Sequence, residues 1–475
     1  MQQQGPAMDW LEKNLDASTS DLARLVAIPG ISTDGNHQAE LEKSAQLVAD
    51  LAHEAGFPEV EVLRPESGYP AVLASWKVDP SLSTVLMLSH HDVQPCNYLS
   101  QWDSDPWVLT EKNGRLFGRG SADDKGGVIA QIMAVKAWAK ALGKPPVNVS
   151  LLVEGEEEVG SKNLLSLARS NQNRLHADAL VVCDTENIQA GLPSITCSLR
   201  GVVTLKVTAK SATIPSHSGM AGGALADPAI ALCWLLGKLA WNKGPIPVGG
   251  LYEGVKPVTE EERKLYRSLP GDESGVRRDL QVLPGVSLAI ETGKNFHEQT
   301  WRRPSVTVIA LEASSIGQAS NQVLPKAEAI ISCRIVPDQD PARVVQVLSE
   351  FLRQPLPWGV EVSVEEIGAH VKWWKTDPSG PAFQAAMEAL ESGFGASPVA
   401  TGCGGTIGFI EPLEKMLGGA PALLFGIEDP ISNAHAPNES LHKSDWQKLM
   451  KSLVGFLGKM AAVKPGNSRT NGVGT

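Results

Sequence analysis

Four glutamates stand where a buried strand is expected to end. Residues 147–153 read VNVSLLV, an apolar and β-branched run after two prolines, which predicts a buried strand. Residues 154–161, EGEEEVGS, follow it directly. Ligands bind outside the carboxyl ends of strands in open α/β sheets, and crowded carboxylates repel one another unless a cation or a shared proton intervenes. The simpler interpretation is that these acids favour the start of a helix over residues 162–169, where negative charge suits the helix N-terminus.

A second chemical segment follows an apolar strand predicted over residues 84–89. It contains His90, His91 and Asp92. Residues two apart on an extended segment face the same way, so His90 and Asp92 can cooperate while His91 points elsewhere. A carboxylate that accepts a hydrogen bond from one imidazole nitrogen leaves the other nitrogen to bind a metal. A single histidine is more often a hydrogen-bonded core side chain than a metal ligand. This segment therefore indicates a metal site only if other ligand residues lie near it.

Six residues along the chain supply imidazole and carboxylate groups suited to zinc or manganese. They are His90, Asp123, Glu157, Glu158, Asp184 and His435. Two metal ions could share one bridging carboxylate. The spacing alone is not diagnostic, because these residues lie far apart in the chain.

Predicted helices alternate with predicted apolar strands around these groups. We expect helices over residues 8–28, 40–55 and 128–142, strands over 71–76, 84–89 and 179–183, and a turn-rich link over 114–120. Asp184 directly follows the last of these strands. Three strands that end in acids or histidines favour an α/β sheet with one active edge.

The middle of the chain has a different pattern. Strands are predicted over residues 202–209, 305–312, 327–336 and 360–367, with helices over 227–240 and 340–353, each opened by an Asp-Pro pair. The order β-α-β-β-α-β is that of a ferredoxin-like unit. A Gly- and Pro-containing insertion, residues 243–304, interrupts it and contains one expected helix over 260–269.

The α/β character returns near residue 377, with helices expected over residues 382–391 and from residue 444. We therefore predict a split catalytic domain, residues 1–199 and 377–475, with an inserted α+β domain, residues 200–376. The polar tail, residues 464–475, is expected to be disordered.

Composition limits the possible functions. With 475 residues, 42% hydrophobic and 20% charged, the chain is expected to form a globular protein of two or three domains. A net charge of −11 argues against nucleic acid as the main partner. We see no secretory signal and no apolar run of membrane-spanning length. The six cysteines form no CxxC pair, which favours free thiols and a cytoplasmic location.

Three stretches resemble motifs of the M20 family of metallopeptidases, and within it the carnosinase-like cytosolic dipeptidases. SHHDVQP at residues 89–95 is similar to the family's His-x-Asp motif, and GRGSADDKG at 118–126 to its bridging-aspartate motif. EGEEEVGS at 154–161 is similar to its Glu-Glu motif. The resemblance runs from about residue 10 to residue 460. It implies a zinc-peptidase-like α/β catalytic domain with an inserted ferredoxin-like lid and dimerisation domain.

The resemblance also implies a dinuclear metal site. Asp123 would bridge two divalent ions, zinc first, with manganese or cobalt as alternatives. His90 and Asp184 would complete one site, and Glu158 and His435 the other.

The remaining roles come from the same resemblance. Asp92 would orient His90, and Glu157 would act as general base and then general acid. In the inserted domain, His217 from IPSHSGM would reach the active site of a partner subunit in a homodimer. Asn321 from ASNQVLP and Arg334 from SCRIVP would contact the substrate carboxylate. The expected partner is therefore a dipeptide or short peptide with a free C-terminus.

One segment departs from the family pattern. GCGGT at residues 402–406 stands where related dipeptidases often have an arginine and an acid before Gly-Gly-Ser. This changes the expected shape and charge of the substrate pocket. Two alternatives follow: an N-acyl amino acid amidohydrolase of the aminoacylase or desuccinylase type, and a catalytically inactive peptide-binding homologue. The intact Glu157 and the full set of ligand positions argue against the second.

Overall fold

The computed structural model describes residues 4–241 and 243–465. The chain divides into two compact units, the first formed by Met1–Cys197, Thr376–Thr401 and Gly408–Thr475, the second by Ser198–Lys375 and Gly402–Ile407. The tail expected to be disordered lies, from residue 466 onward, outside the described residues.

The first unit is built on a mixed sheet in the order β1-β2-β6-β3-β7-β17-β8, with β16 beside β8. Its strands are β1 (Glu59–Leu63), β2 (Ala71–Trp76), β3 (Thr84–His90), β6 (Asn148–Glu154), β7 (Ala179–Glu186), β8 (Ser194–Leu199), β16 (Val399–Cys403) and β17 (Ala422–Glu428). The four central strands β6, β3, β7 and β17 are mutually parallel, so their carboxyl ends meet at one edge. This confirms the predicted α/β sheet.

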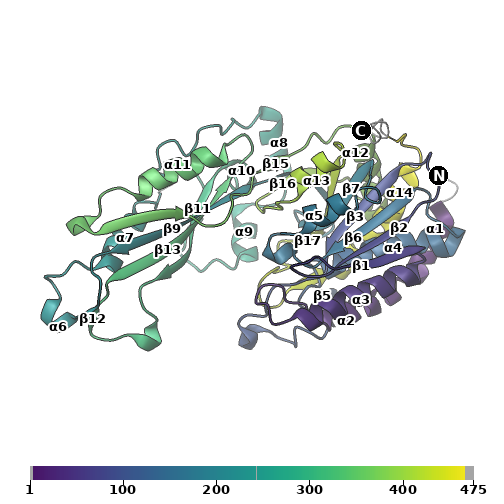
Figure 1. Cartoon of the computed structure of the whole chain (residues 1–475). Helices are drawn as coiled ribbons and strands as arrows, with labels where there is room; N and C mark the ends of the chain where they lie inside the picture. The colour runs from purple at the N-terminus through teal and green to yellow at the C-terminus, as the bar shows by residue number, and fades with distance from the viewer. Residues whose placement is uncertain (1–3, 242, 466–475) are drawn as a thin grey trace, which may run out of the picture. The chain divides into compact units, whose positions relative to one another are not determined.

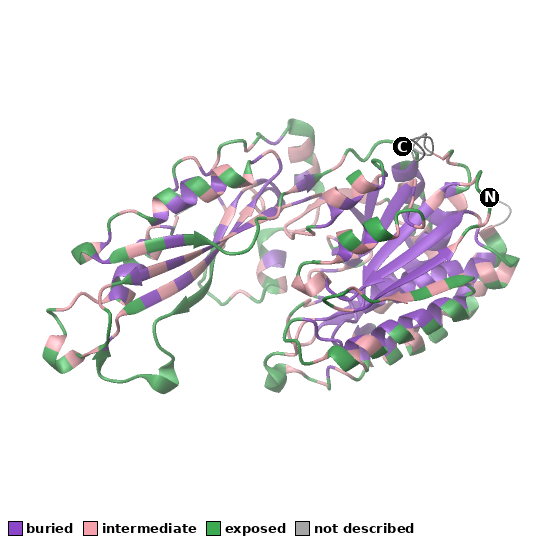
Figure 2. Ribbon diagram, viewed as in Figure 1, coloured by how far each residue is buried: buried purple, intermediate pink, exposed green. Residues whose placement is uncertain are grey.

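The central strands are buried on both faces, as strands of parallel sheets usually are. Every residue of β6 is buried, and β3 is buried from its second residue to His90 (Figure 2). The apolar runs that predicted these strands are therefore explained by helices and loops on both sides of the sheet.

Helices α1 to α4, α12 and α14 share one hydrophobic core with the sheet (Figure 1). The helices of this unit are α1 (Gln4–Lys13), α2 (Leu15–Val26), α3 (Gln38–Ala55), α4 (Lys125–Leu142), α5 (Leu164–Ser170), α12 (Pro381–Phe394), α13 (Ile410–Met416) and α14 (Lys443–Met460). Trp138 of α4 and Trp446 of α14 are among the largest fully buried side chains. Helix α3 ends at Gly56, whose φ of 102° is the left-handed conformation that glycine adopts readily, as predicted.

Three local predictions for this unit were wrong. The single helix predicted over residues 8–28 is two helices, α1 and α2, separated at Asn14. The expected turn-rich link contains strand β5 (Arg115–Phe117), which pairs with β4 (Thr110–Lys112) and β18 (Ser440–His442). A 3-10 turn, η2 (Glu157–Val159), precedes α5, which begins two residues later than predicted. Short elements of this kind are set by tertiary contacts more than by local periodicity.

The second unit contains a four-stranded antiparallel sheet in the order β11-β13-β9-β14. Its elements are β9 (Gly201–Lys210), α7 (Pro228–Gly237), β11 (Ser305–Glu312), β13 (Lys326–Ile335), α11 (Pro341–Leu352) and β14 (Glu361–Glu366). The chain order β-α-β-β-α-β confirms the ferredoxin-like prediction. The side chains of Asp227 and Asp340 cap α7 and α11, each followed by proline at the first helical position. Helix α7 ends at Gly237, earlier than predicted.

Smaller elements complete the second unit. They are the ribbon β10 (Ser216–His217) and β12 (Gln322–Val323), the short helix α6 (Ser218–Ala221), strand β15 (Trp374–Lys375), and α8 (Glu260–Ser268), α9 (Glu273–Asp279) and α10 (Phe296–Arg302) of the insertion. The sequence predicted α8 but not α9 or α10. No helix within residues 4–241 and 243–465 is long and apolar enough to cross a membrane.

Candidate metal centre

The candidate site lies at the carboxyl edge of the first unit's parallel strands. His90 is the last residue of β3, Asp184 lies near the end of β7, and the glutamate-rich turn η2 follows β6. Because β6, β3 and β7 are adjacent and parallel, these groups emerge side by side. Strand order thus brings together side chains that are almost 100 residues apart in the chain.

Asp123 reaches the same edge from the loop that precedes α4. Its Oδ1 lies 3.0 Å from Nε2 of His90, and its Oδ2 lies 2.8 Å from Nε2 of His435. The two oxygens of one carboxylate therefore face two different histidines. This is the arrangement that a bridging carboxylate between two cations requires.

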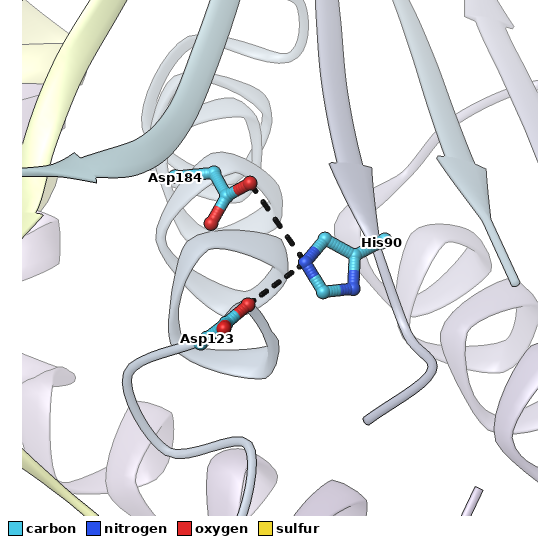
Figure 3. A group of neighbouring side chains, drawn as sticks. All are labelled: His90, Asp123 and Asp184. Atoms are coloured by element: carbon cyan, nitrogen blue, oxygen red, sulfur yellow. Dashed lines mark hydrogen bonds and ion pairs between the residues drawn. The ribbon is translucent and has the colours of Figure 1, made fainter. Parts of the chain in front are cut away.

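Two groups of possible ligands share Asp123. The first is His90, Asp123 and Asp184 (Figure 3), and the second is Asp123, Glu158 and His435. Within each group the candidate ligand atoms all lie within 4.8 Å of one another. Nε2 of His90 is 3.9 Å from Oδ2 of Asp184, and Nε2 of His435 is 3.2 Å from Oε2 of Glu158. The structure therefore brings together all five residues predicted as ligands.

The donor set fits divalent cations chemically. Burial and the charge of Asp123 hold the pKa of Asp184 well above its usual range, and they also raise the pKa of Glu158. Hydrogen bonds to Asp123 and Glu158 raise the pKa of His435 to about 11. Protons thus relieve the repulsion among these carboxylates, and a cation can replace them. Imidazole and carboxylate groups in this number suit zinc, manganese or cobalt.

Asp92 organises the residues around His90. Nδ1 of His90 lies 3.1 Å from the Asp92 carbonyl oxygen and 3.4 Å from Oδ1 of the Asp92 carboxylate, on the opposite side of the ring from Asp123. A proton on Nδ1 leaves the Nε2 lone pair directed at Asp123 and Asp184. The same carboxylate accepts the backbone N–H groups of Glu157 and Glu158, at 3.2 and 3.1 Å. Asp92 therefore connects the end of β3 to turn η2, while Nε2 of His91 lies 2.9 Å from the Pro70 carbonyl oxygen, away from the site.

Glu157 lies beside both groups but belongs to neither of them. Burial raises its pKa to about 7, and the charges of Asp123 and Glu158 add to this effect against that of His90. A carboxyl group with a pKa near neutrality can both accept and donate a proton at physiological pH. A general base and acid needs this property, and the role of Glu157 stays a prediction.

The simpler interpretation of the acidic segment holds for one residue. The carboxylate of Glu156 accepts the backbone N–H of Asn163, the residue before α5, and that of Tyr69. Glu156 therefore stabilises the start of the helix, while Glu157 and Glu158 turn toward the candidate centre.

His435 is exposed within a mostly half-buried loop and has a φ of 62°. The left-handed conformation is uncommon for a residue with a side chain and is retained where surrounding structure imposes it. Here it accompanies contacts of the imidazole with Asp123 and Glu158.

The other predicted residues lie in the second unit. His217 is exposed on the ribbon formed by β10 and β12, and its Nδ1 accepts the N–H of Gly219 at the start of α6. Asn321 is close to it, because the Asn321 carbonyl accepts the N–H of Ser218 at 2.8 Å. Arg334 lies elsewhere, on β13, and donates from Nη1 to Oγ1 of Thr406 at 2.6 Å. In the ribbon His217 is paired with Gln322, the residue after Asn321. The roles of His217, Asn321 and Arg334 stay predictions.

Sequence reasoning missed Glu439, which holds the loop of Asp123. Its buried carboxylate accepts the backbone N–H groups of Gly120, Ala122 and Asp123 and pairs with Arg119 at 2.6 Å. Two other contacts were also missed: Ser32 donates to Asp92, and Gln94 donates to Glu158. The only feature of the sequence near Glu439 is that it lies four residues after His435. A spacing of four residues brings two side chains together in a helix, but it carries no such information in a loop.

Histidine and carboxylate groups gather at the carboxyl edge of the parallel central strands, an arrangement that suits a hydrolase of the metal-dependent class. The sequence profile of Peptidase family M20/M25/M40 matches residues 86–459, and the chain belongs to this family. The chain is 32% identical to the cysteinylglycine-S-conjugate dipeptidase of Corynebacterium striatum over 376 residues, which are 79% of this chain and 80% of that protein.

Solved structures show the same similarity over nearly the full length. The dipeptidase Dug1p of Saccharomyces cerevisiae matches with a TM-score of 0.85 and 26% identity, covering 97% of this chain and 98% of that one. Human carnosine dipeptidase 1 matches with a TM-score of 0.85 and 27% identity, covering 97% and 99%.

Proposed function

We propose that this protein is a dinuclear metal-dependent hydrolase that cleaves dipeptides or short peptides with a free C-terminal carboxylate. The observation that carries this proposal is the carboxylate of Asp123, whose two oxygens face His90 and His435. The dipeptidase names of the relatives support the substrate class.

Two zinc ions are the proposed cofactors, with manganese or cobalt as alternatives. His90, Asp123 and Asp184 would hold one ion, and Asp123, Glu158 and His435 the other. Such ions polarise a carbonyl group and lower the pKa of a water molecule toward neutrality.

Glu157 performs the proton transfers in this proposal. Its carboxylate takes a proton from the water that attacks the peptide carbonyl carbon, and the carboxyl group then gives that proton to the departing amine as the C–N bond breaks. The raised pKa of Glu157, about 7, suits both steps. The Asp92 carboxylate accepts the backbone N–H of Glu157, which keeps Glu157 in place, and Asp92 also keeps His90 in one orientation.

The second unit would supply substrate contacts and the dimer interface. Arg334 and Asn321 are proposed to bind the substrate carboxylate, and His217 to stabilise the oxyanion in the partner subunit's site. Edge strand β11 has exposed apolar side chains at Ile309 and Leu311, and α7 has them at Ile230 and Trp234. An exposed apolar edge strand is a surface that another chain can cover, which supports a homodimer formed through this unit.

We also propose a cytoplasmic location, which the six cysteines support because none of them forms a disulfide bond within the described part of the chain.

A substrate panel tests the function. Purified protein loaded with zinc is incubated with dipeptides, their C-terminal amides, and N-acetyl and N-succinyl amino acids. Rapid cleavage of free dipeptides, its loss with a chelator and its return with added zinc are expected. Cleavage of the N-acyl amino acids alone would establish the amidohydrolase alternative instead. Binding of dipeptides without turnover at any metal loading would identify a peptide-binding homologue.

A further inference from the structure

Two arginines of the second unit are held close together by one short loop. The loop is Gly402–Ile407, which belongs to this unit although it interrupts the C-terminal part of the first. Nε of Arg200 donates to the Gly404 carbonyl at 2.8 Å, and the Arg200 carbonyl accepts the hydroxyl of Thr406 at 2.6 Å. The same hydroxyl accepts a hydrogen bond from Arg334. Thr406 therefore joins the two arginines.

The neighbouring strands bring the two guanidinium groups toward one another. Nη1 of Arg200 donates to Oγ of Ser305, and Ser305 is paired directly with Arg334 across β11 and β13. Both side chains are half-buried. Burial and the charge of Arg334 lower the pKa of Arg200 to about 10, as expected for two cations in proximity.

Across the described part of the chain, neither guanidinium forms an ion pair with a carboxylate. Charged groups withdrawn from water are normally paired, because desolvation without a partner is costly. Other half-buried or buried arginines of this unit follow that rule: Arg303 pairs with Glu291, and Arg302 with Glu262. The pair Arg200 and Arg334 thus has an excess positive charge that a bound anion can balance.

The number of available donors indicates the charge of that anion. Arg200 uses two of its five N–H groups on protein atoms, and Arg334 uses one. The N–H groups that remain outnumber the roughly four lone-pair positions of a single carboxylate. A ligand with two carboxylates matches the two positive charges and the remaining N–H groups of Arg200 and Arg334 better than a ligand with one carboxylate does.

The loop is also held from its other side. A Cβ at Gly402 would lie 2.9 Å from Cγ of Trp301 in α10, and one at Gly404 would lie 3.0 Å from Nη2 of Arg200. The approach of Trp301 leaves little room for a side chain at position 402, and a side chain at position 404 would press on the Arg200 guanidinium. The loop thus lies against both the insertion and Arg200. The spacing of the two guanidinium groups is therefore set before any ligand binds, which lowers the entropic cost of binding.

We propose that Arg200 and Arg334 form a two-guanidinium anion site, and that Arg200 gives the enzyme a preference for peptides whose C-terminal residue has a second carboxylate, aspartate or glutamate. The assignment rests on the proposed peptidase function for its substrate, but the anion site itself can be tested without turnover. Arg200 would act as a specificity-determining residue beside Arg334.

Kinetics with a matched substrate pair test the preference. Alanyl-glutamate and alanyl-glutamine have the same size and differ by one charge. We expect kcat/KM to favour alanyl-glutamate by about tenfold in the wild type, a ratio that one extra charge-assisted contact can supply. Arg200→Met should reduce this ratio to near one, and Arg200→Lys should leave part of it. Arg343→Met, which removes an exposed arginine already paired with Glu253, should keep the wild-type ratio.

Substitutions at Cys403 test the anion site by adding a negative charge beside the two arginines, where the previous test removes a positive one. The Cys403 thiol is near enough to both guanidinium groups to affect the pKa of each. Cys403→Glu would place a carboxylate of the chain itself beside them, whereas Cys403→Gln adds a side chain of the same size without charge. The glutamate variant should lose the preference for alanyl-glutamate, and the glutamine variant should lose much less of it.

Titration calorimetry with glutarate, a dianion, and glutaramate, its monoanionic amide, separates the anion site from the catalytic function. Glutarate should bind the wild type about tenfold more tightly than glutaramate, and the difference should disappear in Arg200→Met and Cys403→Glu. If dipeptides are not cleaved but this binding pattern holds, the peptidase function fails and the anion site stands. Equal glutarate affinity in the wild type and Arg200→Met, or in the two Cys403 variants, would overturn the anion site. Glutarate binding as expected without an advantage for alanyl-glutamate would overturn the preference.

Discussion

The carboxylate of Glu439 accepts the backbone N–H of Asp123 at 3.2 Å, although 316 positions separate the two residues in the chain. The same carboxylate pairs with Arg119, and the Glu439 carbonyl accepts the N–H of Gly118. Because Glu439 follows His435 by four residues, it connects the two loops that supply Asp123 and His435 to the second ligand group. The distance between Asp123 and His435 therefore depends on a residue that touches neither side chain.

The first prediction is that Glu439→Gln weakens metal binding. The amide keeps the size of the side chain but leaves Arg119 without its charged partner, which should lower the free energy of unfolding by about 3 kcal/mol. Zinc affinity, measured by competition with a chelator, should fall more than in Glu111→Gln, a change at an exposed carboxylate of β4. Excess zinc should restore much of the activity. Unchanged zinc affinity in a destabilised but folded variant would show that Glu439 only supports the fold.

The second prediction separates the two adjacent glutamates of η2. Glu157→Gln should abolish turnover while zinc content stays near two ions per chain, because Glu157 lies outside both ligand groups. Glu158→Gln should lose zinc as well as activity. Elemental analysis after gel filtration, together with a dipeptide assay, measures both effects. Loss of zinc from Glu157→Gln, or full zinc content in Glu158→Gln, would mean that the roles are exchanged or shared.

The third prediction concerns pH. Burial raises the pKa of Glu157 to about 7, and the general base must be ionised to accept a proton. The value of kcat/KM should therefore fall as the pH drops through the pKa of Glu157. Bound cations favour the carboxylate, so the midpoint in the zinc-loaded enzyme should lie below about 7.

Zinc content at each pH must be measured alongside the rates, since His435 and the carboxylates also release protons when metal binds. A decline that follows zinc content instead of ionisation would remove Glu157 from this assignment. Glu157 would also lose this assignment if the residual kcat/KM of Glu157→Gln still fell at low pH as it does in the wild type.

The fourth prediction tests the proposed dimer. His217→Ala and Glu157→Ala should each be nearly inactive, because every active site would need Glu157 from one subunit and His217 from the other. When the two variants are mixed under subunit exchange, roughly half of the dimers should be mixed, each with one intact site, so about a quarter of wild-type activity should return. His370→Ala, at another exposed histidine of the second unit, should retain activity. Exchange confirmed by native mass spectrometry without recovery of activity would place His217 outside the partner's site.

Local patterns in the sequence predicted the type of fold and the residues that gather at the edge of the sheet. Apolar runs over β3, β6 and β7 predicted buried strands, and each is followed by acids or histidines. The Asp-Pro pairs at the starts of α7 and α11 predicted those helices through capping and backbone geometry, which act locally. The motifs around His90, Asp123 and Glu157 then indicated the chemistry. These signals succeed because hydrophobic periodicity and caps act over a few residues.

Other features could not be predicted in this way. The periodicity of residues 8–28 continues across Asn14, where the chain divides into α1 and α2, and helices α9 and α10 of the insertion are too short for a clear pattern. Helices of seven residues are stabilised mainly by tertiary packing, which local sequence does not show.

The folded chain shows how Asp123 divides its two oxygens between His90 and His435, and that Glu439 holds the loop of Asp123. It also shows that Arg200 and Arg334 share Thr406. Each of these relationships joins segments that are distant in the chain, through strand order and loop packing. Electrostatic interactions between charged side chains depend on their distances in space, and these distances arise only when the chain has folded.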